Sequence, residues 1–179
     1  TGVQTCALPI WKYKGELPAE KKAVIISVPH TSNWDFFWGE LAFLSQGIPA
    51  FILMKKEFFF FPLGMILRAL NVIPVDRGNK DSQLVEQMIT EFKQRDSMYL
   101  CITPEGSRKK RKKWKKGFLV IAKAAGVPVY LGRIDYKGKY CEVGPLFYPT
   151  EDLDADLAYI MSTYHDANPK YPENFSNGN

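Results

Sequence analysis

The sequence predicts an α/β domain, a three-layer sandwich with a largely parallel central sheet covered by helices. Short apolar runs rich in β-branched residues alternate along the chain with segments of helical spacing. The runs are continuously apolar rather than alternating, as in strands of a sheet that is covered on both faces. The length of 179 residues suits one compact domain with a sizeable core.

The predicted elements follow one another as strand and helix. Six apolar runs are predicted strands, namely residues 23–28, 50–54, 72–75, 98–103, 129–134 and 140–143. Helical spacing of apolar residues predicts helices at residues 34–46, 65–70, 80–95, 118–125 and 152–164. The clearest helix is 80–95, whose apolar residues recur at steps of three and four, and Gly126 marks the end of 118–125.

Composition and charge narrow the class of protein. Hydrophobic residues make up 46% and charged residues 24%, which excludes collagen-like, disordered and disulfide-scaffold chains. The formal net charge is +5, but eight of the 24 Lys and Arg residues lie in residues 108–116, leaving 16 basic against 19 acidic residues elsewhere. The positive charge is therefore one local patch, which suits the binding of an anion.

The two ends of the sequence are expected to differ from the domain between them. Residues 1–10 (TGVQTCALPI) carry no charge and match the translation of a common sequencing adapter, so we expect them to be an artefact. We expect a single domain over residues 11–167 and a loosely ordered tail, rich in Pro, Asn and Gly, over 168–179. Without Cys6, two cysteines remain, too few for a disulfide framework and without metal-binding spacing, which favours a reducing compartment.

The longest apolar run, residues 58–67, contains Pro62 and Gly64 and is too short to span a bilayer, which takes about 20 residues. It has two interpretations. One is a buried loop leading into a helix, and the other is a surface that touches lipid or an acyl chain.

The turn after the first predicted strand contains His30, with Asp35 five residues on in the first turn of the next helix. A carboxylate placed there can meet the imidazole side on, keep one ring nitrogen protonated and leave the other free as a base. Such a pair can remove a proton from a hydroxyl. The alternative is that Asp35 or Asn33 caps the helix and His30 is an ordinary turn residue.

Two further turns follow predicted strands. In the first, Arg77 comes directly after Asp76 and suits a bidentate grip on phosphate, although a buried structural pair of Asp76 with Arg77 is an alternative. In the second, residues 103–108 (TPEGSR) lead into the basic run 108–116. That run has three interpretations: a solvated face, a nucleic-acid patch or an anionic-lipid patch. Because all three turns follow strands of one sheet, their side chains are expected to share one edge.

Taken together, these residues resemble the glycerolipid acyltransferase family, which includes 1-acylglycerol-3-phosphate acyltransferase. Four motifs occur in the family's order over about residues 20–135. They are His30 with Asp35, Asp76-Arg77 after an apolar strand, Pro104-Glu105-Gly106-Ser107-Arg108, and Val127-Pro128-Val129. Asn71 stands where the second motif often has glycine.

The resemblance implies transfer of a fatty acyl group from an acyl thioester, acyl-CoA or acyl carrier protein, to a hydroxyl of a lysophospholipid such as 1-acylglycerol-3-phosphate. His30 would be the general base and Asp35 its partner. The acceptor and its phosphate would be bound by Arg77, Glu105, Gly106, Ser107, Arg108 and Lys116. No metal or other cofactor is implied.

The same resemblance implies a peripheral protein at the inner, cytoplasmic face of the cytoplasmic membrane, docked on anionic lipid by the basic run, with no nucleic-acid partner. Two other functions stay open from the sequence. One is a non-enzymatic module that binds anionic lipid or nucleic acid through residues 108–116. The other is a thioesterase that uses His30 and Asp35 on water.

Overall fold

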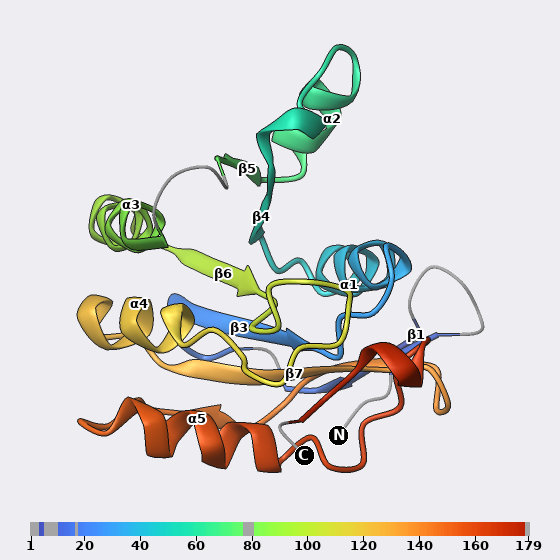
Figure 1. Cartoon of the computed structure of the whole chain (residues 1–179). Helices are drawn as coiled ribbons and strands as arrows, with labels where there is room; N and C mark the ends of the chain where they lie inside the picture. The colour runs from blue at the N-terminus through green and yellow to red at the C-terminus, as the bar shows by residue number, and fades with distance from the viewer. Residues whose placement is uncertain (1–3, 6–10, 17, 77–80, 178–179) are drawn as a thin grey trace.

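The computed structural model describes residues 4–5, 11–16, 18–76 and 81–177 (Figure 1). Nine strands of this described part form one mixed sheet. They are β1 (Gln4–Thr5), β2 (Lys12–Gly15), β3 (Lys22–Val28), β4 (Ala50–Lys55), β5 (Val72–Val75), β6 (Met98–Ile102), β7 (Val129–Asp135), β8 (Tyr140–Val143) and β9 (Leu146–Phe147). All six predicted strands are present, with bounds that differ by a residue or less.

The sheet has the order β1-β2-β8-β7-β3-β6-β4-β5, with β9 paired to β7. β3 runs parallel to both β6 and β7, and β4 runs parallel to β5 and β6. The pairs of β7 with β8 and with β9 are antiparallel, as is β1 with β2. The prediction of a largely parallel sheet is confirmed. The register that aligns Ile26 with both Ile102 and Leu131 brings the carboxyl ends of β3, β6 and β7 together.

Helices cover both faces of the sheet. The α-helices are α1 (Trp34–Ser45), α2 (Leu63–Ala69), α3 (Asp81–Gln94), α4 (Gly117–Ala125) and α5 (Leu153–Ser162), with short 3-10 turns η1 (Lys56–Phe58) and η2 (Pro172–Asn174). Along β3, Val24 and Ile26 pack toward α3, α4 and α5, whereas Ala23 and Ile25 pack toward α1. Because both faces of β3 are buried, its sequence is continuously apolar, and the three-layer architecture is confirmed.

The segment from η1 through α2, residues 56–69, stands apart from the body of the domain at the far end of β4 and β5 (Figure 1). We call it the apolar arm. Its large apolar side chains are exposed, with Phe61 at 83%, and they include Phe58, Phe60, Met65 and Ile66. The interpretation of residues 58–67 as a buried loop is therefore wrong, although Gly64 and Leu67 inside the arm are buried.

The C-terminal segment, residues 168–176, packs against the domain, in contrast to the loose tail that its composition predicts. Phe175 lies beside Trp114, with ring centroids 6.4 Å apart, and the Trp114 indole N–H donates to the Ser176 carbonyl at 2.9 Å. Trp114 belongs to the basic run but is buried in the main core. The basic run is thus not simply a solvated face, because its one aromatic residue anchors the C-terminal segment.

Within residues 1–10, β1 pairs with β2. This pairing does not test whether residues 1–10 come from a sequencing adapter, so their origin stays a prediction.

Of the helices that the structure describes, none combines the length and apolarity needed to cross a bilayer.

We predict that Trp114→Ala lowers the free energy of unfolding by about 3–5 kcal/mol, because it empties a core site and removes the indole N–H that donates to the Ser176 carbonyl. Phe61→Ala in the apolar arm is the matched control, with an expected change within about 0.5 kcal/mol. Urea unfolding of both variants measures the difference. Equal effects of the two substitutions would contradict the anchoring role of Trp114.

Candidate active site

The site forms where the turns after β3 and β6 meet. His30 follows β3 and Glu105 follows β6, and these two strands are neighbours in the sheet. The backbone N–H of His30 donates to Oε1 of Glu105 at 2.8 Å. The first and third sequence motifs are therefore in direct contact at the carboxyl edge of the sheet, where ligands bind in folds of this class.

His30 and Asp35 form the predicted pair. Nδ1 of His30 lies 3.3 Å from Oδ2 of Asp35. The Asp35 side chain is 2% exposed and that of His30 is 21% exposed, so the acid is enclosed while the imidazole remains partly exposed to solvent. This separation is slightly longer than an ordinary N–H···O hydrogen bond.

The Asp35 carboxylate is held by groups from two parts of the chain. Oδ2 accepts hydrogen bonds from the backbone N–H groups of Thr31 and Ser32, each at 2.7 Å. Oδ1 accepts a hydrogen bond from the Tyr136 hydroxyl at 2.6 Å. These donors offset the cost of burying the negative charge.

The structure contradicts the alternative that Asp35 or Asn33 caps α1 through its side chain. Asn33 occupies the N-cap position but its side chain makes no capping hydrogen bond, and Asp35 lies inside the first turn. The Asn33 amide oxygen instead accepts a hydrogen bond from the Arg108 guanidinium. A guanidinium from the third motif is thus placed at the turn that carries His30.

Glu105 is a second buried carboxyl beside the pair. Its Oε2 is buried and has no hydrogen-bond partner among the described residues. Burial raises the pKa of Glu105 to about 8, assisted by the nearby charge of Asp35, and only partly opposed by the N–H of His30. Glu105 is therefore largely protonated at neutral pH, in contrast to a surface glutamate.

Gly106 and Ser107 shape the loop between Glu105 and Arg108. Gly106 has a φ of +63°, and a Cβ there would lie 3.3 Å from the side chain of Lys115, so this position suits glycine. The Ser107 hydroxyl accepts a hydrogen bond from the N–H of Lys109 at 3.1 Å. Both residues hold the loop that presents Arg108.

The remaining predicted residues are not joined to His30 by the contacts of the described chain. Nζ of Lys116 pairs with the carboxylate of Asp154 in α5 at 2.9 Å, so its role in acceptor binding stays a prediction. Arg77 lies outside the described residues. Asp76 is exposed and pairs with Lys56, which contradicts a buried structural role for Asp76.

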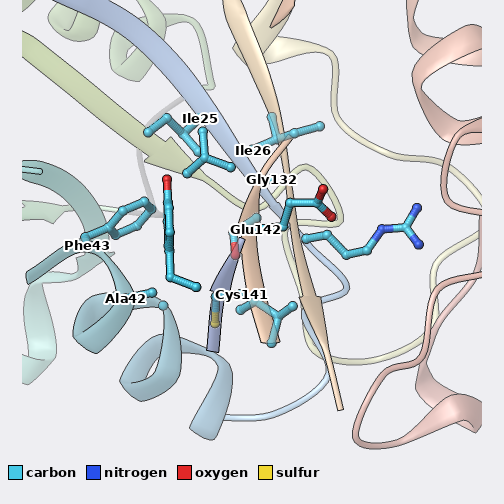
Figure 2. A pocket seen from close by; sticks show the side chains of 13 residues that line it. Ile25, Ile26, Ala42, Phe43, Gly132, Cys141 and Glu142 are labelled. Atoms are coloured by element: carbon cyan, nitrogen blue, oxygen red, sulfur yellow. The ribbon is translucent and has the colours of Figure 1, made fainter. Parts of the chain in front are cut away.

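Two hollows lie near these elements. A cavity of about 20 Å³ lies between α1 and the sheet, lined by residues such as Ile25, Phe43 and Cys141 (Figure 2). It has room for little more than one water molecule, and neither His30 nor Asp35 lines it. A hollow of about 340 Å³ lies at the carboxyl end of β5, beside the second motif.

A comparison with models of protein families shows to which family the chain belongs. The family model described as acyltransferase matches residues 11–131. The chain belongs to the acyltransferase family. No curated protein and no solved structure matches it significantly. All four motifs of this acyltransferase lie within the matched residues, and the match supports a general acyltransferase function.

Tyr136, which follows the last residue of β7 and lies beyond the matched residues, was not predicted from the sequence. Its hydroxyl donates to Asp35, 101 positions away in the chain, and no local pattern predicts such a contact.

The backbone conformation at Asn71, in contrast, has a signal in the sequence. Asn71, which stands where the family often has glycine, adopts a φ of +57°, a region that asparagine tolerates better than most residues.

We predict that the stability of this acyltransferase falls as pH rises from about 5 to 8. The folded state holds the Glu105 proton up to pH 8 while the unfolded state releases it near its ordinary pKa, so the folded state binds more protons in this window. Glu40 in α1, whose pKa burial raises to about 7, acts in the same direction.

Chemical denaturation at several pH values tests this. Glu105→Gln should flatten the pH dependence of the free energy of unfolding up to pH 8, and Glu40→Gln should do so only up to pH 7. Each substitution should remove a slope of at most about 1.4 kcal/mol per pH unit. A slope that is unchanged in Glu105→Gln would show that Glu105 is ionised in the folded protein.

Proposed function

We propose that this acyltransferase moves a fatty acyl group from an acyl thioester to a hydroxyl of a lysophospholipid such as 1-acylglycerol-3-phosphate. The observation that carries the proposal is the partly exposed His30 held against the buried Asp35, with the cationic Arg108 at the same turn. A base beside a cation suits an acceptor that carries both a hydroxyl and a phosphate.

In this mechanism the ring nitrogen of His30 that faces away from Asp35 takes the proton of the acceptor hydroxyl. The oxygen attacks the thioester carbonyl carbon, a C–O bond forms, and the C–S bond breaks as the tetrahedral intermediate collapses. The thiolate leaves and takes the proton back from the imidazolium. Asp35 stabilises that imidazolium and keeps the ring in one orientation.

Direct transfer, without an acyl-enzyme, is supported by the state of Cys101. Its thiol is buried in the core under α1, and burial raises its pKa to about 12. A thiol in that state supplies no thiolate for nucleophilic attack at neutral pH. Cys141 is buried as well.

The acceptor's phosphate is proposed to bind Arg108, together with Arg77 and Lys116. Glu105 adds a physical reason for this arrangement. Because it is largely protonated at neutral pH, it places no second negative charge beside the phosphate. Gly106 and Ser107 would line the same part of the acceptor site.

The membrane-facing surface is proposed to combine the apolar arm and the basic run 108–116. Exposed Phe60, Phe61 and Met65 are flanked by the exposed cations Lys55 and Arg68, a pattern that suits the interface of an anionic bilayer. The protein would then act as a peripheral enzyme on the cytoplasmic side, using acyl-CoA or acyl carrier protein as donor. Acyl-chain contact is assigned to the same arm.

We predict that His30→Ala lowers acyl transfer by about 10²- to 10⁴-fold, because it removes the general base. The assay supplies an acyl thioester and lysophosphatidate and follows both thiol release and acylated product. His165→Ala is the matched control, since His165 is exposed and bonds Ser162, and its rate should not change.

Two outcomes would contradict the proposal. Equal turnover by His30→Ala and the native chain would exclude His30 as the base. Thiol release without acylated acceptor would indicate a thioesterase instead.

We predict that Phe61→Glu weakens binding to vesicles of phosphatidylglycerol and phosphatidylcholine at least about tenfold, because a carboxylate is repelled by anionic lipid and resists burial in the interface. Tyr148→Glu is the control, as Tyr148 is also well exposed but lies outside the arm. Vesicle co-sedimentation measures both variants. Equal losses would show that the arm does not contact the bilayer.

A further inference from the structure

We propose that Tyr136 is a positioning residue for the His30–Asp35 pair, and that Asn168 in the C-terminal segment holds Tyr136 in place. The part of this proposal that concerns catalysis rests on the proposed function. The part that concerns the geometry of the pair does not depend on it.

The two oxygens of the Asp35 carboxylate have different partners. Oδ2 faces His30 and accepts from the backbone of the same turn, whereas Oδ1 accepts from the Tyr136 hydroxyl at 2.6 Å. Loss of that hydroxyl would leave a buried oxygen without this donor. A buried oxygen in that state costs free energy unless the carboxylate turns or water enters, and either change moves the oxygen that orients His30.

Tyr136 is itself fixed by the C-terminal segment. Its backbone N–H donates to the Asn168 carbonyl at 2.9 Å, and the Asn168 side-chain amide donates to Asp135 at 2.7 Å. Its ring packs edge-on against Trp11, with centroids 5.1 Å apart. These contacts hold the backbone and the ring of Tyr136.

The same segment also reaches the turn that carries His30. The backbone N–H of Tyr171 donates to the Thr31 hydroxyl at 3.3 Å, and Nζ of Lys170 lies over the ring of Trp34 at 5.2 Å. One short stretch of chain therefore contacts both Tyr136, through Asn168, and the turn of His30, through Tyr171. The His30–Asp35 pair is thus supported both through Tyr136 and through its own turn.

The Tyr136 hydroxyl stays protonated and can therefore always donate its hydrogen bond to Asp35. Burial and the neighbouring Asp35 carboxylate raise the pKa of this phenol above its usual range. The hydroxyl keeps its proton at any pH at which the enzyme would work. It therefore donates to Asp35 throughout and does not act as an acid or base in the reaction.

The test compares Tyr136→Phe with a matched control, Tyr99→Phe. Tyr99 also donates its hydroxyl, to the Glu20 carbonyl at 2.8 Å, but lies at the amino end of the parallel strands, opposite the site. For Tyr136→Phe we expect kcat to fall about 10- to 100-fold with KM within about twofold, as for other groups that orient a catalytic ligand. Tyr99→Phe should keep its kcat.

A second readout follows His30 directly. The chain has only two histidines, so the ring signals of His30 and His165 are readily distinguished by NMR. In Tyr136→Phe we expect the Nδ1–H resonance of His30 to move or broaden, while His165 stays unchanged. Asn168→Ala should change the His30 resonance in the same direction, because it removes the amide bond to Asp135 that holds this segment.

The outcomes separate the two proposals. An unchanged His30 resonance and unchanged kcat in Tyr136→Phe would overturn the positioning role, as would a kcat loss that accompanies a fall in melting temperature but no change at His30. A changed resonance in a chain without acyl transfer activity would support positioning and refute the proposed function.

Discussion

The site depends on one buried negative charge. Burying a carboxylate costs several kcal/mol unless donors surround it, and Asp35 meets that requirement with two backbone N–H groups, the Tyr136 hydroxyl and the nearby His30 ring. Those donors come from the turn after β3 and from the hairpin between β7 and β8. The folded arrangement that satisfies the charge is therefore the same arrangement that orients the imidazole.

Glu105 lies beside the His30–Asp35 pair, but its environment favours the neutral form of its carboxyl group. Asp35 is surrounded by donors, whereas Glu105 receives the His30 N–H at one oxygen and has its other oxygen buried without a partner in the described chain. Environment alone thus separates the two carboxyls: hydrogen-bond donors surround Asp35 beside the His30 ring, whereas burial keeps Glu105 largely neutral at neutral pH. Such divergence of neighbouring acids is typical of catalytic sites.

The elements that the sequence predicted are those whose formation depends on residues close together in the chain. β3 and β6 are continuously apolar because both faces are covered, and the polar turns that follow them contain His30 and Glu105. β2 was missed because it is four residues long and half of them are lysine, and its pairing with β8 depends on distant residues. Tyr136 and the packed C-terminal segment were missed for the same reason, since contacts between distant parts of the chain leave no periodic pattern.

The packing of residues 168–176 has a consequence for the order of events during synthesis. The turn that contains His30 is synthesised well before the groups that Asn168 and Tyr171 supply to it and to Tyr136. A nascent chain can pair β3 with β6 while these contacts are still missing. The His30–Asp35 pair therefore gains these contacts only after the strands of the described sheet have been synthesised.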